Sequence, residues 1–148
     1  MKTKHQPPIA LGAFTEGKKL YCLFSSKDKI ALAESENAED FQLTKIRFPL
    51  KNFRRIHIST LDIGKMAVME LKNGGLEIAV SSDLKKWTSL CILKGSAYTS
   101  GSIVSDYQID GDYLMYLGGK SISLAVSRNG TKWEPVFFSR PILTVKNN

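Results

Sequence analysis

The chain has 148 residues, of which 43% are hydrophobic and 24% are charged, and this is the composition of a soluble globular protein. The composition excludes a disordered tail, a collagen-like fibre and a disulfide-stapled mini-protein, and no apolar run is long enough for a transmembrane helix. The chain has 21 Lys and Arg residues and 14 Asp and Glu residues, so its net charge is +7, which favours anionic partners.

The first residues and the cysteines indicate a compartment. Residues 1–8 carry the positive charge of a signal peptide but lack its long apolar stretch and its cleavage site. Cys22 and Cys91 lie inside apolar runs and are expected to be buried thiols in a reducing environment. The sequence therefore predicts a cytoplasmic protein that does not associate with membranes.

Strands are predicted in three groups of four. In chain order within each group, the first strands are expected at 9–14, 56–61 and 103–107, and the second strands at 20–24, 66–71 and 113–117. Turn signals at 26–29, 72–75 and 118–121 close a hairpin to third strands that begin at Ile30, Leu76 and Ile122. Fourth strands are expected at 41–48, 87–93 and 133–138. The best helix candidate, 33–40, overlaps a turn and is weak.

The third strands open a repeated motif, apolar-x-apolar-Ala-x-Ser-x-[Asp/Asn]-x-x-x-aromatic. Its serines are Ser35, Ser81 and Ser127, which are 46 residues apart both times. The same offset aligns Asn37, Asp83 and Asn129, and then Phe41, Trp87 and Trp133. We expect the Ser and Asp/Asn side chains to hold the turn before the fourth strand, and the aromatic residue to pack between neighbouring units.

Four strands in about 46 residues are typical of a β-propeller blade. The sequence therefore predicts an all-β, single-domain chain (1–148) with three blades at about 6–51, 52–97 and 98–143. Three blades leave two open sheet edges, and closed propellers usually have about four to eight blades. We expect two copies to close a six-bladed ring, so that the protein is a homodimer.

The third unit carries a resemblance to a known group of enzymes. The run from Asp112 to Trp133, continued by Glu134-Pro135 and later by Arg140-Pro-Ile-Leu143, resembles the blades of five-bladed glycosidase propellers. These are the arabinanase and xylosidase group (glycoside hydrolase family 43) and the mannoside phosphorylase group (family 130). The matched residues are blade scaffolding, so the resemblance implies a fold rather than an activity.

Enzymes of those families carry catalytic carboxylates near the starts of the innermost strands, and the resemblance implies the same positions here. The corresponding positions here read Gln6-Pro7, then Asn52-Phe53-Arg54-Arg55, then Thr99-Ser100-Gly101-Ser102, and none of them is a carboxylate. Asp106 is a nearby acid, whereas Asp62 is expected at the opposite end of its strand. Without an acid and a base, we expect no catalytic residues and no glycosidase activity.

The candidate site is instead basic. Between Lys45 and His57 the chain carries five Lys and Arg residues and no acid, and the alternative is a solvated surface. Guanidinium groups at the start of the second inner strand would suit a phosphate, a carboxylate or an acidic protein loop. The candidate ligand-binding residues are Arg54, Arg55, His57, Ser100, Ser102 and Asp106.

Three functions are compatible with the sequence. The leading hypothesis is a non-catalytic protein that binds an anionic small molecule or a carbohydrate, and the second is a divergent glycoside hydrolase or phosphorylase. The third is an interaction protein that caps another macromolecule. No metal site or cofactor is expected, since His5, His57 and the two cysteines lack zinc-ligand spacing. Nucleic acid is a possible partner, but the sequence has no recognisable binding motif for it.

Overall fold

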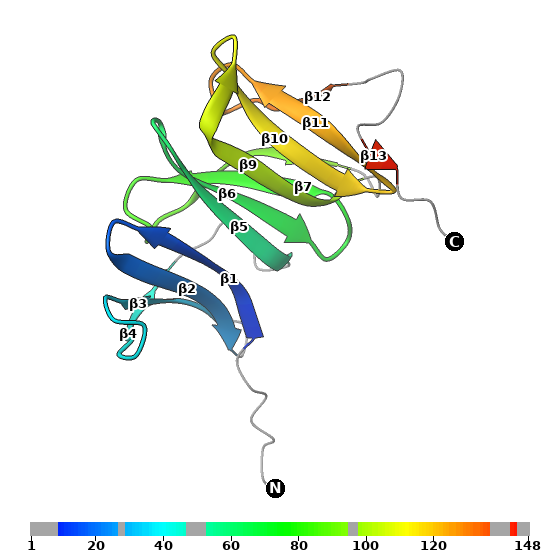
Figure 1. Ribbon diagram of the computed structural model, residues 1–148. Coiled ribbons are helices and arrows are strands. Elements are labelled where there is room, and N and C mark those ends of the chain that lie inside the picture. Colours follow the sequence, from blue (N-terminus) through cyan, green and yellow to red (C-terminus); the bar gives the residue numbers. More distant parts are fainter. Residues whose placement is uncertain (1–8, 27–28, 47–52, 95–97, 137–142, 145–148) are drawn as a thin grey trace, which may run out of the picture.

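The computed structural model describes residues 9–26, 29–46, 53–94, 98–136 and 143–144, and these residues form three antiparallel sheets and no helix. The sheets lie side by side, with the second between the first and the third (Figure 1). Three such four-stranded units make the chain a partial β-propeller, as the repeat predicts. None of the described residues forms a helix with the length and apolar character needed to cross a bilayer.

Each sheet follows chain order, in line with the predicted hairpins. Sheet 1 consists of β1 (Ile9–Glu16), β2 (Lys19–Ser26), β3 (Lys29–Ser35) and β4 (Gln42–Lys45). Sheet 2 consists of β5 (Phe53–Leu61), β6 (Gly64–Leu71), β7 (Leu76–Ser81) and β8 (Thr88–Leu93). Sheet 3 consists of β9 (Tyr98–Ile109), β10 (Asp112–Gly119), β11 (Ser121–Ser127) and β12 (Glu134–Val136), and β13 (Leu143–Thr144) also pairs with β11.

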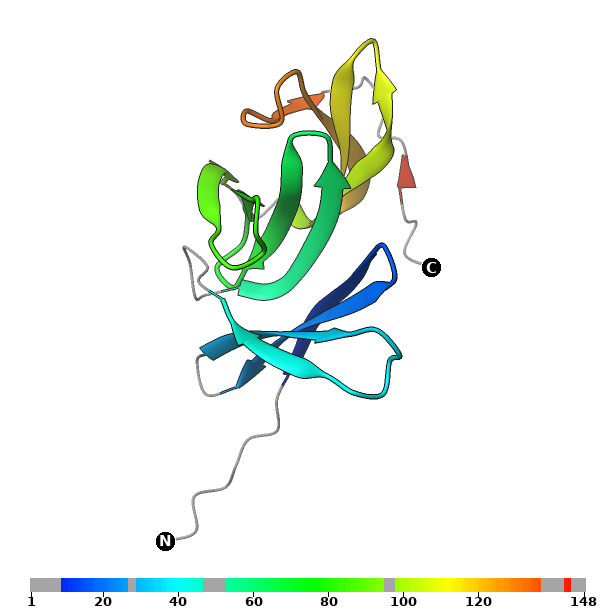
Figure 2. The same ribbon diagram turned by 90° about the vertical axis from the view of Figure 1, so that its left-hand side faces the viewer.

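The antiparallel order gives the molecule two distinct ends. The first strands β1, β5 and β9 contact one another across the sheets, so they are the inner strands. We call the end where these strands begin the start end. At the opposite end, the turn end, lie the first hairpin turns (17–18, 62–63 and 110–111) and the turns that carry the repeated serines. Figure 2 shows the curvature of the hairpins from a second side.

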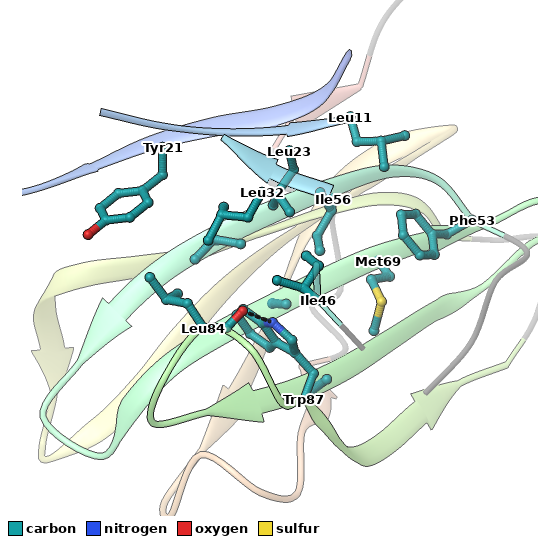
Figure 3. Close-up of a cluster of buried hydrophobic side chains, with 13 residues drawn as sticks. Leu11, Tyr21, Leu23, Leu32, Ile46, Phe53, Ile56, Met69, Leu84 and Trp87 are labelled. Carbon is teal, nitrogen blue, oxygen red and sulfur yellow. Dashed lines mark hydrogen bonds between the residues drawn. The ribbon is translucent and has the colours of Figure 1, made fainter. Parts of the chain in front are cut away.

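Two hydrophobic clusters join the sheets. The first lies between sheets 1 and 2, where Leu11, Leu23 and Leu32 meet Ile56 and Met69 (Figure 3). The second lies between sheets 2 and 3. The central strand β6 supplies both, because its alternate residues Ala67 and Met69 face sheet 1 while Met66 and Val68 face sheet 3. A strand buried on both faces explains why the run from Met66 to Leu71 is almost continuously apolar.

Two glycines of inner strands allow neighbouring sheets to approach closely. A Cβ atom at Gly12 would lie 2.4 Å from the carbonyl oxygen of Ile56, and one at Gly101 would lie 2.8 Å from a methyl group of Leu76. Both distances are shorter than a real Cβ contact, so a larger residue would displace the backbone of β5 at Gly12 and the buried side chains of sheet 2 at Gly101.

The repeated Ser and Asp/Asn residues hold the turns as the motif predicts. Asp83 accepts hydrogen bonds from the backbone N–H groups of Lys85 and Lys86, at 2.8 and 2.9 Å. Asn37 and Asn129 make the equivalent bonds in sheets 1 and 3. The next residue in each turn has a positive φ, which is 62° at Ala38, 62° at Leu84 and 72° at Gly130. No helix forms at 33–40, in line with the all-β prediction, because β3 runs to Ser35 and these side chains close a turn after it.

The repeated aromatic residues are only partly as predicted. Trp87 and Trp133 are 6% and 4% exposed and pack between sheets, each with its indole N–H donated to a carbonyl of its own turn (Figure 3 for Trp87). Phe41, the equivalent residue of sheet 1, is 42% exposed. The prediction that it packs between units is wrong for Phe41, because among the described residues sheet 1 packs only against sheet 2, on its other side.

Each predicted strand overlaps an observed one, although β4 ends at Lys45 and is shorter than expected, and residues 137–138 of the last predicted strand lie outside the described residues. The cysteines also differ from the prediction. Cys22 and Cys91 are free thiols but are half-buried rather than buried. Burial raises the pKa of the Cys91 thiol, partly offset by a backbone hydrogen bond at Trp133.

Candidate functional site

The candidate site lies at the start end, between the inner strands β5 and β9. Alternate residues of β5 point across to β9, because side chains at i and i+2 share one face of a strand. Ser59 Oγ donates a hydrogen bond to the carbonyl of Ile103 at 2.9 Å, and His57 Nε2 lies 3.0 Å from Ser102 Oγ. Arg55 is the next residue along the same face, and it lines a cavity together with Ser100.

This cavity has a volume of about 350 Å³. It is open to solvent, and its lining residues are Arg54, Arg55, Glu70, Thr99 and Ser100. Three of the candidate ligand-binding residues, Arg54, Arg55 and Ser100, therefore meet at one place. His57 and Ser102 form a hydrogen-bonded pair one step further along the same two strands.

A β-bulge explains why two consecutive arginines line the same cavity. Phe53 pairs with Leu71 and Arg55 pairs with Glu70, so Arg54 is an additional residue without a partner position on β6. In a regular strand, neighbouring side chains point to opposite faces, whereas a bulge brings them closer in direction. The local irregularity thus concentrates the positive charge.

The β9 side of the cavity is fixed by β10. A Cβ atom at Gly118 would lie 2.2 Å from Ser100 Oγ, so any larger residue at position 118 would displace that hydroxyl group. Thr99 Oγ1 donates a hydrogen bond to the carbonyl oxygen of Gly118, at 3.4 Å. The two hydroxyl groups are therefore held against the same short stretch of β10.

The cavity combines two positive charges with one negative charge. Within the described ranges, no ion pair joins Arg54 or Arg55 to Glu70 or to any other carboxylate. Planar guanidinium groups bind carboxylates and phosphates through paired hydrogen bonds. Glu70 accepts hydrogen bonds, and the hydroxyl groups of Thr99 and Ser100 both donate and accept, which suits the hydroxyl groups of a ligand.

His57 adds a group whose charge depends on pH. Its partial burial beside β9 lowers the pKa of the imidazole below the usual value of 6.5. At neutral pH the ring is therefore uncharged, and it does not add to the positive charge of the arginines.

The remaining predicted residues lie elsewhere or outside the described parts. The backbone of Asp106 belongs to β9, where residues 104–107 oppose only residue 114 of β10, so Asp106 lies in an irregular part of the ladder, and its side chain lies outside the described part of the structure. Asp62 lies at the turn end, as predicted, and accepts a hydrogen bond from the Tyr113 hydroxyl group. Gln6, His5 and Asn52 fall outside the described residues.

Sequence reasoning missed Glu70 and Thr99. The signal for Glu70 was present, because counting back from the first hairpin turn at 62–63 places Glu70 opposite Arg55. The family resemblance points to carboxylates at the starts of the inner strands, whereas Glu70 comes from the end of the neighbouring strand β6. Thr99 is adjacent to Ser100 and follows from the same reasoning.

The fold resembles solved structures of glycoside hydrolases. A structure from the GH130 family of mannoside phosphorylases, which contains glycoside hydrolases that target β-1,2-mannosidic linkages in Candida mannan, matches with a TM-score of 0.71 and 20% identity. A candidate glycoside hydrolase from Bacteroides ovatus matches with a TM-score of 0.75 and 20% identity. A glycosyl hydrolase from the same species matches with a TM-score of 0.67 and 19% identity.

These matches cover 91–97% of this chain but only 51–55% of the other chains, so the protein spans about half the length of the structures it resembles. No protein-family model and no curated protein sequence matches the chain. At this identity the likeness concerns the fold: the chain is a partial propeller of the glycosidase-like type. An activity has to be inferred from the residues of the site rather than from the fold.

Proposed function

We propose that the protein binds an anionic small molecule, such as a sugar that carries a carboxylate or phosphate group, in the cavity between β5 and β9, and that it does so without catalysis. The observation that carries this proposal is the pair of arginines at one cavity with two hydroxyl groups and Glu70. The guanidinium groups would hold the anionic group, and the hydroxyl groups and Glu70 would bind the hydroxyl groups of the sugar.

The dimensions of the cavity support a small ligand. Ligand pockets usually have volumes of about 300–1,000 Å³, and the volume of about 350 Å³ lies at the lower end of that range. The cavity is polar and open, so charge-assisted hydrogen bonds rather than apolar burial would provide the affinity.

The hypothesis that the protein is not a catalyst rests on the number of carboxylates that line the cavity. Glycoside hydrolysis needs two carboxyl groups on either side of the scissile bond. Glu70 is the one carboxylate among the described residues that line this cavity. A single carboxylate can accept hydrogen bonds from a sugar, but it cannot act as both acid and base in the same step.

Isothermal titration calorimetry with purified protein tests the proposal. The probes are inorganic phosphate, glucose 6-phosphate and glucuronate, with neutral glucose as the uncharged control. We expect the charged sugars to bind at least tenfold more tightly than glucose, and the affinity to fall with added salt. Equal binding of glucose and the charged sugars, or no binding of any probe at millimolar concentration, would contradict the proposal.

A divergent glycoside hydrolase is the second candidate, and Glu70 is the observation that favours it. A panel of chromogenic glycosides separates the two functions. The binding proposal predicts no turnover above background in wild type. Turnover that is lost in the variant Glu70→Gln, with an unchanged circular dichroism spectrum, would identify an enzyme instead.

A further inference from the structure

The two internal contacts between sheets share a feature at the turn end. Lys65, near the start of β6, donates a hydrogen bond to Glu16, at the end of β1 in the preceding sheet. Tyr113, near the start of β10, donates to Asp62 in the first hairpin turn of sheet 2. In both cases, a donor at the start of a second strand binds an acidic residue at the first hairpin of the preceding sheet. We call this contact the latch.

The position of the donor is defined by strand register. Lys65 pairs with Ser81 and Tyr113 pairs with Ser127, and both serines belong to the repeated motif. In sheet 1 the residue that pairs with Ser35 is Leu20. The open side of sheet 1 therefore lacks the latch donor. The adjacent Lys19 is already close to two carboxylates, Glu34 at 3.8 Å and Glu36 at 3.9 Å.

Sheet 1 also carries negative charge around this position, where sheets 2 and 3 carry positive or neutral residues. Four residues of its motif and turn are acidic, and they are Glu34, Glu36, Glu39 and Asp40. The residues 46 positions later, in sheet 2, are Val80, Ser82, Lys85 and Lys86. Those 92 positions later, in sheet 3, are Val126, Arg128, Thr131 and Lys132. No acid occupies any of these eight equivalent positions, so the acidic character belongs to sheet 1 alone.

A cavity of about 360 Å³ lies at the same place. Its lining includes Lys19, Glu34, Glu36 and Asp40. The apolar surface beside it is exposed, with Phe41 at 42% and Leu43 at 68%. In sheets 2 and 3 the residues equivalent to Phe41 are buried by the preceding sheet. The cavity and the exposed aromatic ring together mark the space that a preceding sheet and its first hairpin turn fill at the two internal contacts.

We propose that the open side of sheet 1 docks a propeller blade of another protein chain, and that the first hairpin turn of this blade carries a Lys or Arg residue. At the two internal latches, the later sheet supplies the donor and the hairpin of the preceding sheet supplies the acid. Sheet 1 presents carboxylates at the place of the donor, so the docked hairpin would supply a basic residue in place of the acid. The exposed Phe41 ring would pack against the docked sheet, as Trp87 and Trp133 do at the internal contacts.

A second copy of this chain, the homodimer expected from the number of blades, is the competing occupant, and the acidic charge of its first hairpin in sheet 3 does not fit. The first hairpin of sheet 3 has the sequence Asp110-Gly111-Asp112, and Asp110 follows β9 as Asp62 follows β5. Within the described residues, no hydrogen bond or ion pair engages the Asp110 side chain, and Asp112 lies near Arg128 of its own sheet. Self-closure would place Asp110 beside the four acidic residues of sheet 1, and like charges at an interface oppose binding.

The test reverses the charge of that turn and measures self-association. Multi-angle light scattering on wild type at about 50 µM is expected to give the mass of a monomer, because the two faces repel. The variant Asp110→Lys supplies a basic turn to the acidic face of a second copy and is expected to form dimers at least tenfold more tightly than Asp110→Asn. The asparagine variant is the matched control, since both substitutions occupy the same position with positive φ (51°).

A second variant alters the other partner of the contact. Glu34→Val with Glu36→Ser introduces the residues of sheet 2 and is expected to remove the dimerisation of Asp110→Lys. Cooperative unfolding of each variant verifies that it is folded. A wild-type protein that is already a stable dimer, or an Asp110→Lys chain that associates no more than Asp110→Asn, would overturn the proposal. Both outcomes leave the ligand titrations at the start end unaffected, so this inference is independent of the proposed function.

Discussion

Ser102 Oγ lies 3.0 Å from His57 Nε2, and this hydrogen bond joins the inner strands of two different sheets. Ser59 Oγ and the carbonyl of Ile103 make a second bond between the same strands, at 2.9 Å. These two contacts fix the position of β5 against β9. Because Arg55 and Ser100 lie further toward the start end of these strands, the same contacts set the width of the candidate ligand cavity.

The pH dependence of stability is expected to report on His57. Partial burial lowers its pKa in the folded protein below 6.5, so the unfolded chain binds more protons than the folded chain as the pH falls below 6.5. The contribution of His57 to stability is therefore fully present above about pH 6.5 and declines toward lower pH. Urea unfolding at pH 7.5 and pH 5.5 measures it. The variant His57→Gln should lose less stability than wild type between the two pH values, and an equal loss would contradict the assignment.

Substitution of Gly101 is expected to separate sheets 2 and 3. An added Cβ atom would lie 2.8 Å from Leu76 Cδ1 and 2.9 Å from Val68 Cγ1, in a cluster that is fully packed. Overpacking of a core typically costs about 1–3 kcal/mol, so Gly101→Ala should lower the free energy of unfolding by that amount. Chemical denaturation provides the measurement. Gly111→Asn is the control, since a Cβ atom there meets nothing within 4 Å and asparagine tolerates a positive φ. An unchanged midpoint in Gly101→Ala would show that the sheets are not packed as described.

The repeated aromatic positions should differ in their contribution to stability. Trp133 is 4% exposed and lies between two sheets, so Trp133→Ala is expected to cost about 3–5 kcal/mol. Phe41 occupies the same position of the motif but is 42% exposed, so Phe41→Ala should cost about 1 kcal/mol or less in the isolated chain. Thermal or urea unfolding compares the two. Similar losses in both variants would mean that Phe41 is covered in solution, by a second chain or by another part of the protein.

The repeat made most of the fold predictable. The 46-residue spacing of Ser35, Ser81 and Ser127 placed three turns of the same kind, and the apolar runs before them placed the hairpins. These features are local, since a turn depends on side chains two or three residues away. The packing of Phe41 was not predictable in the same way. Its burial depends on a neighbouring sheet, which a local repeated motif does not specify.

The site was predictable only in part, for a similar reason. Arg54, Arg55 and Ser100 were found because they begin inner strands, and the structure brings them together. Glu70 was missed because it reaches the cavity from the neighbouring strand, through a register that must be counted from the turn. The bulge at Arg54 was not visible in the sequence, since no glycine or proline marks it. Tertiary register therefore decides which charges share the cavity.

The most direct test of the central claim is calorimetric titration of glucose 6-phosphate into wild type, Arg54→Ala/Arg55→Ala and Lys85→Ala/Lys86→Ala. The lysine variant is the matched control, because it removes the same charge from exposed side chains of a turn at the opposite end of sheet 2. Charge-assisted hydrogen bonds contribute about 1.5–3 kcal/mol each, whereas exposed charges contribute about 0–1 kcal/mol. The arginine variant is therefore expected to bind at least tenfold more weakly than wild type, and the lysine variant within about threefold of it. Equal losses in the two variants would contradict an anion site at the arginines and would assign their charge to the solvated surface.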